Sequence, residues 1–300
     1  MTTTPILVST RAELAAVLAE RRTAGQRVGM VPTMGALHEG HGSLMETARD
    51  AVGDGPVVVS VFVNPLQFGA GEDLDRYPRT LDADLELCGA HGVDVVFAPS
   101  VSEVYPGGDP QVTVEPGPLG SILEGATRPG HYRGVLTVVA KLFGLVRPDV
   151  AVFGQKDYQQ LVLIRRMVSD LCLGVEVIGA ETVREPDGLA LSSRNRYLNE
   201  VDRERASALS RVLNRAVRDA DHGPEFALGS ARAELRKARG VNLDYLVITD
   251  PDLGAVPEQG EGRILIAARV GTTRLIDNLP IHFGATASTT TSPNTTEGDS

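Results

Sequence analysis

The sequence predicts an α/β protein with a Rossmann-like, doubly wound parallel sheet followed by a second, smaller α+β domain. Up to residue 182, short β-rich runs alternate with amphipathic helical runs, which is typical of a parallel sheet with helices on both faces. From Val183 the chain changes to a polar loop, two helices and three strands. We therefore expect domains at 1–182 and 183–284. A tail at 285–300 is expected to be disordered, because it has almost nothing apolar to bury.

The first elements follow from a capping pattern and from hydrophobic spacing. Thr10 and Glu13 form a capping box that predicts a first helix. Near-continuous apolar runs predict strands over 27–32 and 56–63. A helix is expected between these strands, because one of its faces carries the apolar residues Leu44, Met45, Ala48, Ala51 and Val52.

The remaining elements repeat this alternation. We expect helices over 81–90 and 135–146, a helix with Leu161, Ile164, Val168 and Leu171 in register, and strands at 93–99, 149–154 and from Val175. In the second domain, a helix has an apolar stripe of Leu209, Val212, Leu213, Ala216, Val217 and Ala220, and a second helix has Leu228, Ala231, Leu235 and Ala238. Its strands are expected over 241–248, 263–270 and 273–281.

Composition limits the class of partner and the compartment. With 29 Lys and Arg against 39 Asp and Glu, the net charge of −10 has the wrong sign for general attraction to nucleic acid. A small anionic ligand is still compatible, because helix N-termini make a pocket locally positive. There is no secretory signal and no run that could span a bilayer, so we expect a cytoplasmic protein without a membrane partner. Cys88 and Cys172 lack Cys-x-x-Cys spacing and are expected to be buried, reduced thiols.

The segment PTMGALHEGH, residues 32–41, lies between the first sheet strand and the helix after it. Gly35 and Gly40 allow a phosphate to approach the backbone, and His38 and His41 place two imidazoles at a helix N-terminus. This arrangement is suited to binding phosphate oxygens and stabilising charge that grows on them. A zinc site is the weaker interpretation, because its pattern has histidines four residues apart. A loop of structural histidines is the other alternative.

This segment resembles the His-x-Gly-His signature of the adenylate-forming nucleotidyltransferase superfamily, in the form found in the pantothenate synthetase (pantoate:beta-alanine ligase) family. Three further segments match that family in order: FVNPLQFG (62–69), FGQKDYQQ (153–160) and LSSRNRYL (191–198). The resemblance implies ATP-dependent condensation of (R)-pantoate with beta-alanine through a pantoyl adenylate, with release of AMP and pyrophosphate. It also implies a role in pantothenate and coenzyme A biosynthesis and a homodimer.

The resemblance and the local chemistry together predict the nucleotide site. Lys156 and Asp157 open a helix directly after a strand, and Ser192, Ser193 and Arg194 offer two hydroxyls and a guanidinium to phosphate oxygens. A helix-start charge pair and a plain capping turn are the alternatives for these two segments. The expected catalytic residues are His41, His38, Lys156 and Arg194. The expected ATP-binding residues are Met34, Gly35, His38, Gly40, His41, Gly154, Lys156, Asp157, Val183, Leu191, Ser192, Ser193 and Arg194.

Two glutamines are expected to bind pantoate. By resemblance Gln67 and Gln160 orient its hydroxyl and carboxylate, and Gln67 also serves beta-alanine. Pro32, Met34 and Phe62 would then contact its dimethyl carbon, with ordinary packing at strand ends as the alternative.

Asp84 matches the family position that helps to hold Mg²⁺, the expected cofactor beside ATP, and a solvated helical charge is the alternative. Three positions depart from the family pattern. Ala83 stands where a second acid can occur, Gln155 stands where Glu is usual, and Gly42 stands where a larger apolar residue is usual.

Two other functions stay open from the sequence. One is another nucleotidyltransferase of the same superfamily, which would leave the nucleotide on its product. The other is a non-catalytic nucleotide-binding regulator, against which the two glutamines argue.

Overall fold

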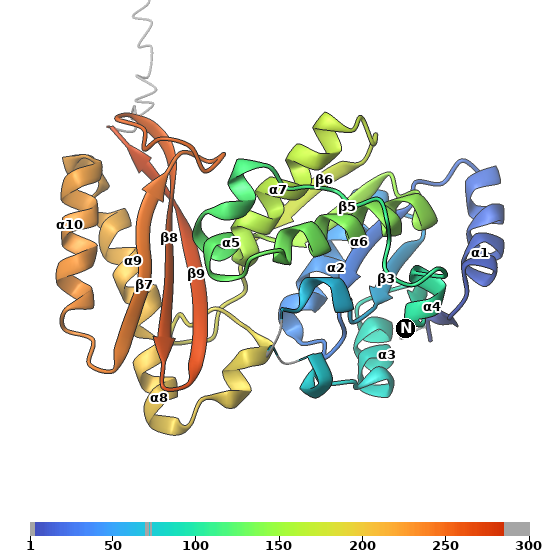
Figure 1. Ribbon diagram of the computed structural model, residues 1–300, viewed down its shortest axis with the longest axis horizontal. Coiled ribbons are helices and arrows are strands. Elements are labelled where there is room, and N and C mark those ends of the chain that lie inside the picture. Colours follow the sequence, from blue (N-terminus) through green and yellow to red (C-terminus); the bar gives the residue numbers. More distant parts are fainter. Residues whose placement is uncertain (1–3, 70–71, 73, 285–300) are drawn as a thin grey trace, which may run out of the picture.

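The computed structural model describes residues 4–69, 72 and 74–284, and the predicted tail at 285–300 lies outside this range. Two sheets dominate the molecule (Figure 1). One is parallel and belongs to the first part of the chain, and the other is antiparallel and is built from the last three strands. The predicted α/β class with a smaller α+β part is therefore confirmed.

The first sheet has six parallel strands in the order β1-β4-β3-β2-β5-β6. They are β1 (Ile6–Val8), β2 (Gly29–Thr33), β3 (Val57–Val61), β4 (Val95–Phe97), β5 (Val150–Gly154) and β6 (Glu176–Ala180). The edge strand β1 has only three residues and was not predicted. From β2 the chain adds β3 and β4 on one side of the sheet, and from β5 it adds β6 on the other side. The topological switch point therefore lies between the neighbours β2 and β5, and ligands of such sheets bind at this point.

Helices cover this sheet, and their apolar faces form its core. They are α1 (Arg11–Thr23), α2 (Glu39–Val52), α3 (Leu81–Ala90), α6 (His131–Val146) and α7 (Tyr158–Asp170), with the short α4 (Val101–Val104) and α5 (Leu123–Thr127). The capping box at Thr10 and Glu13 is confirmed. Helix α6 begins four residues before the predicted start, because the left-handed Gly130 (φ 81°) precedes it.

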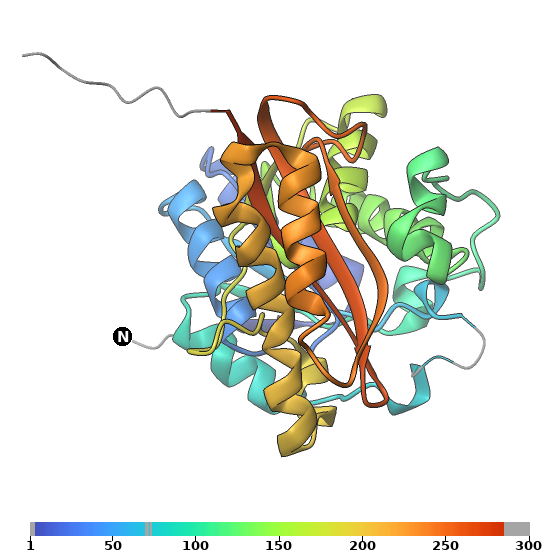
Figure 2. The same cartoon turned by 90° about the vertical axis from the view of Figure 1, so that its left-hand side faces the viewer.

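Helices pack over the outer face of the second sheet (Figure 2). Its strands are β7 (Val241–Thr249), β8 (Gly260–Val270) and β9 (Thr273–Phe283), and its helices are α8 (Glu200–Ala206), α9 (Ala208–Arg218) and α10 (Pro224–Leu235). The predicted α9 stripe is buried at Leu209, Val212, Leu213 and Ala216. On the inner face, Tyr245 and Leu265 pack into the core of the first domain. The boundary at 182/183 stays a prediction and falls two residues after β6 ends.

Short 3-10 helices complete the fold: η1 (Pro65–Gln67), η2 (Leu74–Arg76), η3 (Pro118–Ser121), η4 (Gln155–Asp157), η5 (Ser193–Tyr197) and η6 (Ala220–His222). Among the described residues, no helix is both long and apolar enough to cross a membrane. Cys88 is buried, as predicted, whereas the prediction for Cys172 is wrong. Cys172 is exposed because it lies in the turn after α7, with a left-handed φ of 51°.

Candidate active site

A cavity of about 260 Å³ lies beyond the ends of β2 and β5. It adjoins a larger cavity of about 930 Å³ between the two sheets, since both are lined by Arg128, His131, Lys156 and Arg194. Most of the predicted site residues line the smaller cavity: Pro32, Met34, His38, Gly40, His41, Phe62, Gln67, Gly154, Lys156, Asp157, Gln160, Val183, Leu191, Ser192, Ser193 and Arg194. Gly35 and Asp84 do not line it.

The two histidines are fixed by the first turn of α2. His38 is the N-cap residue, and its Nδ1 accepts the Gly40 N–H at 3.1 Å. His41 Nδ1 accepts the His38 N–H at 3.2 Å, and the ring centroids are 4.2 Å apart. Because each Nδ1 is an acceptor, the proton of each neutral ring lies on Nε2. Both rings therefore keep one N–H that can be donated to a ligand.

Both imidazoles are neutral near pH 7. Burial lowers the pKa of His41 to about 3, with a smaller contribution from His38. Burial also lowers the pKa of His38, and the Lys156 and Arg196 charges act in the same direction. The pair can therefore stabilise phosphate charge by hydrogen bonding rather than by a net positive charge.

Asp84 holds the loop that precedes these histidines. In this loop Gly35 (φ 83°) and Ala36 (φ 52°) are both left-handed, a conformation that is strained for alanine. The Asp84 carboxylate accepts the N–H groups of Ala36 at 3.2 Å and Leu37 at 2.8 Å, and the Thr80 hydroxyl at 3.1 Å. A Cβ on Gly35 would lie 2.9 Å from Asp84 Oδ2, which explains the glycine.

These contacts give Asp84 a structural role in the loop, and its predicted contact with magnesium stays a prediction. The residue is only 2% exposed, and both carboxylate oxygens are already bonded to the loop and to Thr80. Across the described parts of the chain, no cluster of three or more His, Cys, Asp or Glu side chains could hold a metal ion. Mg²⁺ commonly takes only one or two carboxylates and completes its shell with water and phosphate oxygens, so the predicted site needs no such cluster.

Lys156 lies in the η4 turn directly after β5. Its side chain is 18% exposed, and its Nζ lies 3.8 Å from Asp157 Oδ2. Both ends of the neighbouring Gln155 amide are bonded: its Nε2 donates to Gly179 O at 2.8 Å and its Oε1 accepts from Arg263 at 2.9 Å. A glutamate could not make the first of these bonds, so the family departure at Gln155 has a local reason.

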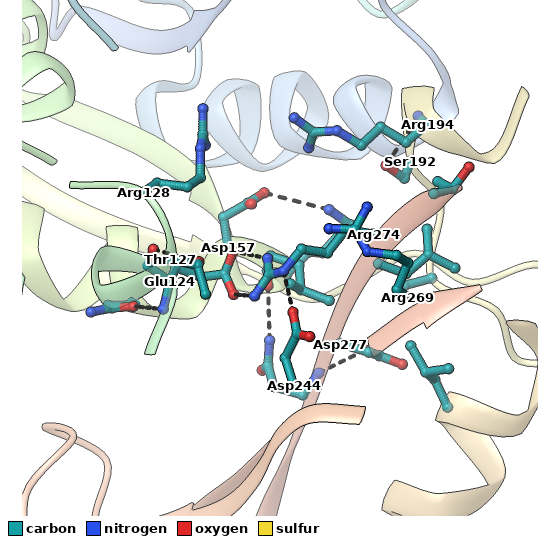
Figure 3. A pocket seen from close by; sticks show the side chains of 18 of the residues that line it. Glu124, Thr127, Arg128, Asp157, Ser192, Arg194, Asp244, Arg269, Arg274 and Asp277 are labelled. Atoms are coloured by element: carbon teal, nitrogen blue, oxygen red, sulfur yellow. Dashed lines mark hydrogen bonds and ion pairs between the residues drawn. The ribbon is translucent and has the colours of Figure 1, made fainter. Parts of the chain in front are cut away.

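Ser192 and Arg194 enter from the polar loop after β6. Ser192 Oγ accepts the Arg194 N–H at 3.2 Å, so the capping-turn interpretation is correct for this hydroxyl. Its proton can still be donated to a ligand. In Figure 3 the side chains of Ser192 and Arg194 lie on one side of the larger cavity, and that of Arg128 lies on the opposite side.

Gln67 is positioned by a residue that the sequence analysis missed. Asn64 is 1% exposed, and its Nδ2 donates to Gln67 Oε1 and to Gly134 O, both at 3.1 Å. Its Oδ1 accepts the Tyr105 hydroxyl at 2.8 Å. The Asn-Pro pair at the start of η1 was the available signal, because such pairs favour turns.

Arg128 and His131 were also missed. His131 Nδ1 donates to the Gln67 carbonyl at 2.8 Å, and Arg128 bonds to the same oxygen at 3.3 Å and to Glu72. Burial lowers the pKa of His131, and Arg128 lowers it further. His131 opens α6 after a glycine, and this helix-start position resembles that of His38.

Thr182 is a third missed residue. It lines the smaller cavity, and its Oγ1 is buried without a hydrogen-bond partner among the described residues. An orphaned hydroxyl at this position is suited to a polar ligand group. Nearby, the Leu191 N–H bonds Val183 O at 2.9 Å, which closes the loop that carries both residues.

Gly42 is explained by its neighbour His91. A Cβ on Gly42 would lie 2.5 Å from His91 Nε2. The His91 ring is held by Glu46, with 2.9 Å between Nδ1 and Oε1, and lies 3.5 Å from Glu39. The first turn of α2 is therefore packed against His91, the residue that follows α3.

The fold and the site together indicate the class of protein. A parallel sheet with two histidines, a lysine and a serine–arginine loop at its switch point is suited to an enzyme that binds the phosphates of a nucleotide. The family model described as pantoate-beta-alanine ligase matches residues 6–280. The chain belongs to the pantoate–beta-alanine ligase family.

Curated relatives and solved structures agree with this assignment. A pantothenate synthetase from a Nocardioides species is 70% identical over 292 residues, which are 95% of this chain and 87% of the relative. A pantothenate synthetase from a Mycobacterium species is 58% identical over 264 residues, 88% of this chain and 84% of the relative.

Two crystal structures are similar to this chain. That of pantothenate synthetase from Thermus thermophilus has a TM-score of 0.85 and 50% identity, and the match covers 91% of this chain and 98% of that one. That of a Francisella tularensis pantoate-beta-alanine ligase, complexed with beta-gamma ATP and beta-alanine, has a TM-score of 0.75 and 35% identity, and covers 92% and 97%. These comparisons confirm the predicted family, fold class and ATP-dependent ligase activity.

Proposed function

We propose that this chain joins (R)-pantoate to beta-alanine in two steps, through an enzyme-bound pantoyl adenylate. In the first step a pantoate carboxylate oxygen attacks the α-phosphorus of ATP, and the bond from that phosphorus to pyrophosphate breaks. In the second step the neutral amine of beta-alanine attacks the adenylate carbonyl and expels AMP, and the amine loses a proton. One observation carries the proposal: two neutral imidazoles, Lys156 and two glutamines line one cavity at the switch point.

His38 and His41 stabilise the α-phosphate as it becomes five-coordinate. Their Nδ1 atoms are used by the helix backbone, so their Nε2–H groups are the donors for phosphate oxygens. Because both rings are fixed before substrate binds, little reorganisation is needed when charge develops. Glycines 35, 40 and 154 and the residues Met34, Asp157, Val183 and Leu191 complete the proposed ATP site.

Lys156, Ser192, Ser193 and Arg194 bind the leaving pyrophosphate. An ammonium and a guanidinium neutralise charge that moves onto the leaving oxygens, and the hydroxyls donate hydrogen bonds. Lys156, Ser192 and Arg194 are supported by their position between the two cavities, and Ser193 by its position in the smaller one.

Pantoate lies between Gln67 and Gln160, with its dimethyl carbon against Pro32, Met34 and Phe62. The proposal for Gln67 is supported by two hydrogen bonds that fix this residue. Asn64 donates to its side-chain oxygen, and His131 donates to its main-chain carbonyl. Gln67 is then placed to orient beta-alanine as well, after pyrophosphate leaves.

Magnesium is proposed to enter as part of the substrate, MgATP. Mg²⁺ commonly fills most of its shell with water and phosphate oxygens. The family position of Asp84 makes it the proposed protein contact of this ion, beside its role in holding the loop. The homodimer and the cytoplasmic location are proposed on the family resemblance and on the sequence, respectively.

The test measures pyrophosphate and AMP released from MgATP, first with pantoate alone and then with beta-alanine added. We expect one stoichiometric burst of pyrophosphate with pantoate, followed by steady AMP production once beta-alanine is present. A product that keeps the nucleotide, without free AMP, would indicate the other type of nucleotidyltransferase. ATP binding without pyrophosphate release under either condition would indicate a regulator and overturn the proposal.

A further inference from the structure

We propose that Asn278, in strand β9 of the smaller domain, is a positioning residue that holds the turn carrying Lys156. The inference rests on the proposed role of Lys156 in the adenylation step. It assigns to the smaller domain a part in building the site that is independent of its serine–arginine loop.

The Asn278 side chain crosses the interface between the domains. It is 2% exposed, and its Nδ2 donates to the main-chain oxygens of Gln155 and Lys156, both at 2.9 Å. An amide nitrogen carries two hydrogens, so its donors are fully used on this one turn. These two carbonyls belong to η4, the turn that joins β5 to α7.

Arg263 on β8 fixes the amide from the other side. Its Nε donates to Asn278 Oδ1 at 2.7 Å, and its Nη2 donates to Gln155 Oε1 at 2.9 Å. Its guanidinium also lies over the Tyr158 ring, with 4.1 Å to the centroid. The Asn278 amide therefore has one orientation, in which Nδ2 faces the turn.

The backbone of Asn278 is held as well. Its N–H donates to Asp277 Oδ1 at 2.7 Å, and its carbonyl accepts from Arg184 at 3.2 Å. Arg184 makes a bidentate pair with Asp277 at 2.7 and 2.9 Å. The chain of contacts thus runs from the loop beside Val183, through β9, to the Lys156 main chain.

An asparagine is needed at this position. An aspartate would place acceptors against two carbonyl oxygens, and an alanine would remove the side-chain donors to those carbonyls and the acceptor of the Arg263 Nε. Either change shifts the turn, and a shift of about 1 Å in a charged group near the reacting atoms can cost about 100-fold in rate.

The experiment is a double-mutant cycle on the single-turnover rate of adenylation with MgATP and pantoate, using wild type, Asn278→Ala, Lys156→Met and the double variant. We expect Asn278→Ala to lower this rate roughly 10- to 100-fold in the wild-type background, with little change in the KM for pantoate. In the Lys156→Met background the same substitution should change the rate by less than about 3-fold, because the ammonium group that Asn278 positions is absent. Its effect on the thermal midpoint should be the same in both backgrounds.

Ser210→Ala is the matched control, since Ser210 is another buried polar residue of the smaller domain, 4% exposed, on α9. It should lower the thermal midpoint without changing the adenylation rate. If Asn278→Ala does not fold, Asn278→Ser takes its place in the same cycle. Equal rate losses in both backgrounds would overturn the inference while leaving the role of Lys156 intact. A Lys156→Met rate close to that of wild type would overturn that role and the inference together.

Discussion

The two strand ends that meet at the switch point are held in different ways. The loop after β2, which leads to His38, is fixed by Asp84 of the same domain through two backbone N–H groups. The turn after β5, which carries Lys156, is fixed by Asn278 of the other domain through two backbone carbonyls. The loop before the histidine pair is therefore held by a residue of the larger domain, whereas the position of Lys156 depends on the docking of the smaller domain.

The largest effect on this comparison is expected from Asp84→Asn. The change replaces one acceptor oxygen with a donor that faces a backbone N–H, which should cost about 1–3 kcal/mol of unfolding free energy. The released loop should also slow adenylation by about 10-fold, because the histidines lose their fixed positions. Urea unfolding and single-turnover kinetics measure the two effects.

The same variant separates loop positioning from metal binding. Asp82→Asn is the control, since Asp82 is an exposed residue of the same helix, and it should change neither quantity. If Asp84 only holds the loop, the Mg²⁺ concentration for half-maximal rate should be unchanged in Asp84→Asn. A 10-fold or larger increase would show that Asp84 also binds the metal.

The sequence was informative where the determinants are local. Hydrophobic spacing predicted the strands around β2 and β5, and the His38–His41 segment could be placed at a helix N-terminus from its position alone. The partners of these segments could not be predicted. In the sequence, Asp84 is one of several acidic residues of a predicted helix, and nothing marks it as a partner of the loop before His38. Asn278 lies more than one hundred residues after Lys156, in a strand with no motif. Pairings of this kind depend on tertiary packing, which no periodicity reports.

A smaller effect is expected at the contact that supports the first turn of α2. Alanine in place of Gly42 gains about 1 kcal/mol of helix propensity, but its Cβ would overlap the His91 ring. We expect Gly42→Ala to lower the unfolding free energy by about 1–2 kcal/mol. In a His91→Ala background the same substitution should be stabilising. Destabilisation of equal size in both backgrounds would show that His91 is not the cause.

A further effect is expected on the pH dependence of stability. The pKa of His41 is lowered from 6.5 to about 3 in the folded protein, mainly by burial. The unfolded chain therefore binds a proton that the folded chain does not, so this contribution is complete above pH 6.5 and is lost as the pH falls toward 3. His41→Gln should flatten the decline in unfolding free energy between pH 7 and about 5. Urea unfolding at the two pH values measures this decline. If the decline is the same in His41→Gln as in wild type, His41 is not buried in its neutral form.

The adenylation step is tested most directly by following one oxygen atom. Pantoate labelled with ¹⁸O in its carboxylate is condensed with beta-alanine, and the AMP is examined by mass spectrometry. If the carboxylate attacks the α-phosphorus, one labelled oxygen stays on phosphorus when the amine expels AMP, so each AMP carries one ¹⁸O. Unlabelled AMP, with the label in pyrophosphate or wholly retained in the amide product and water, would contradict the account.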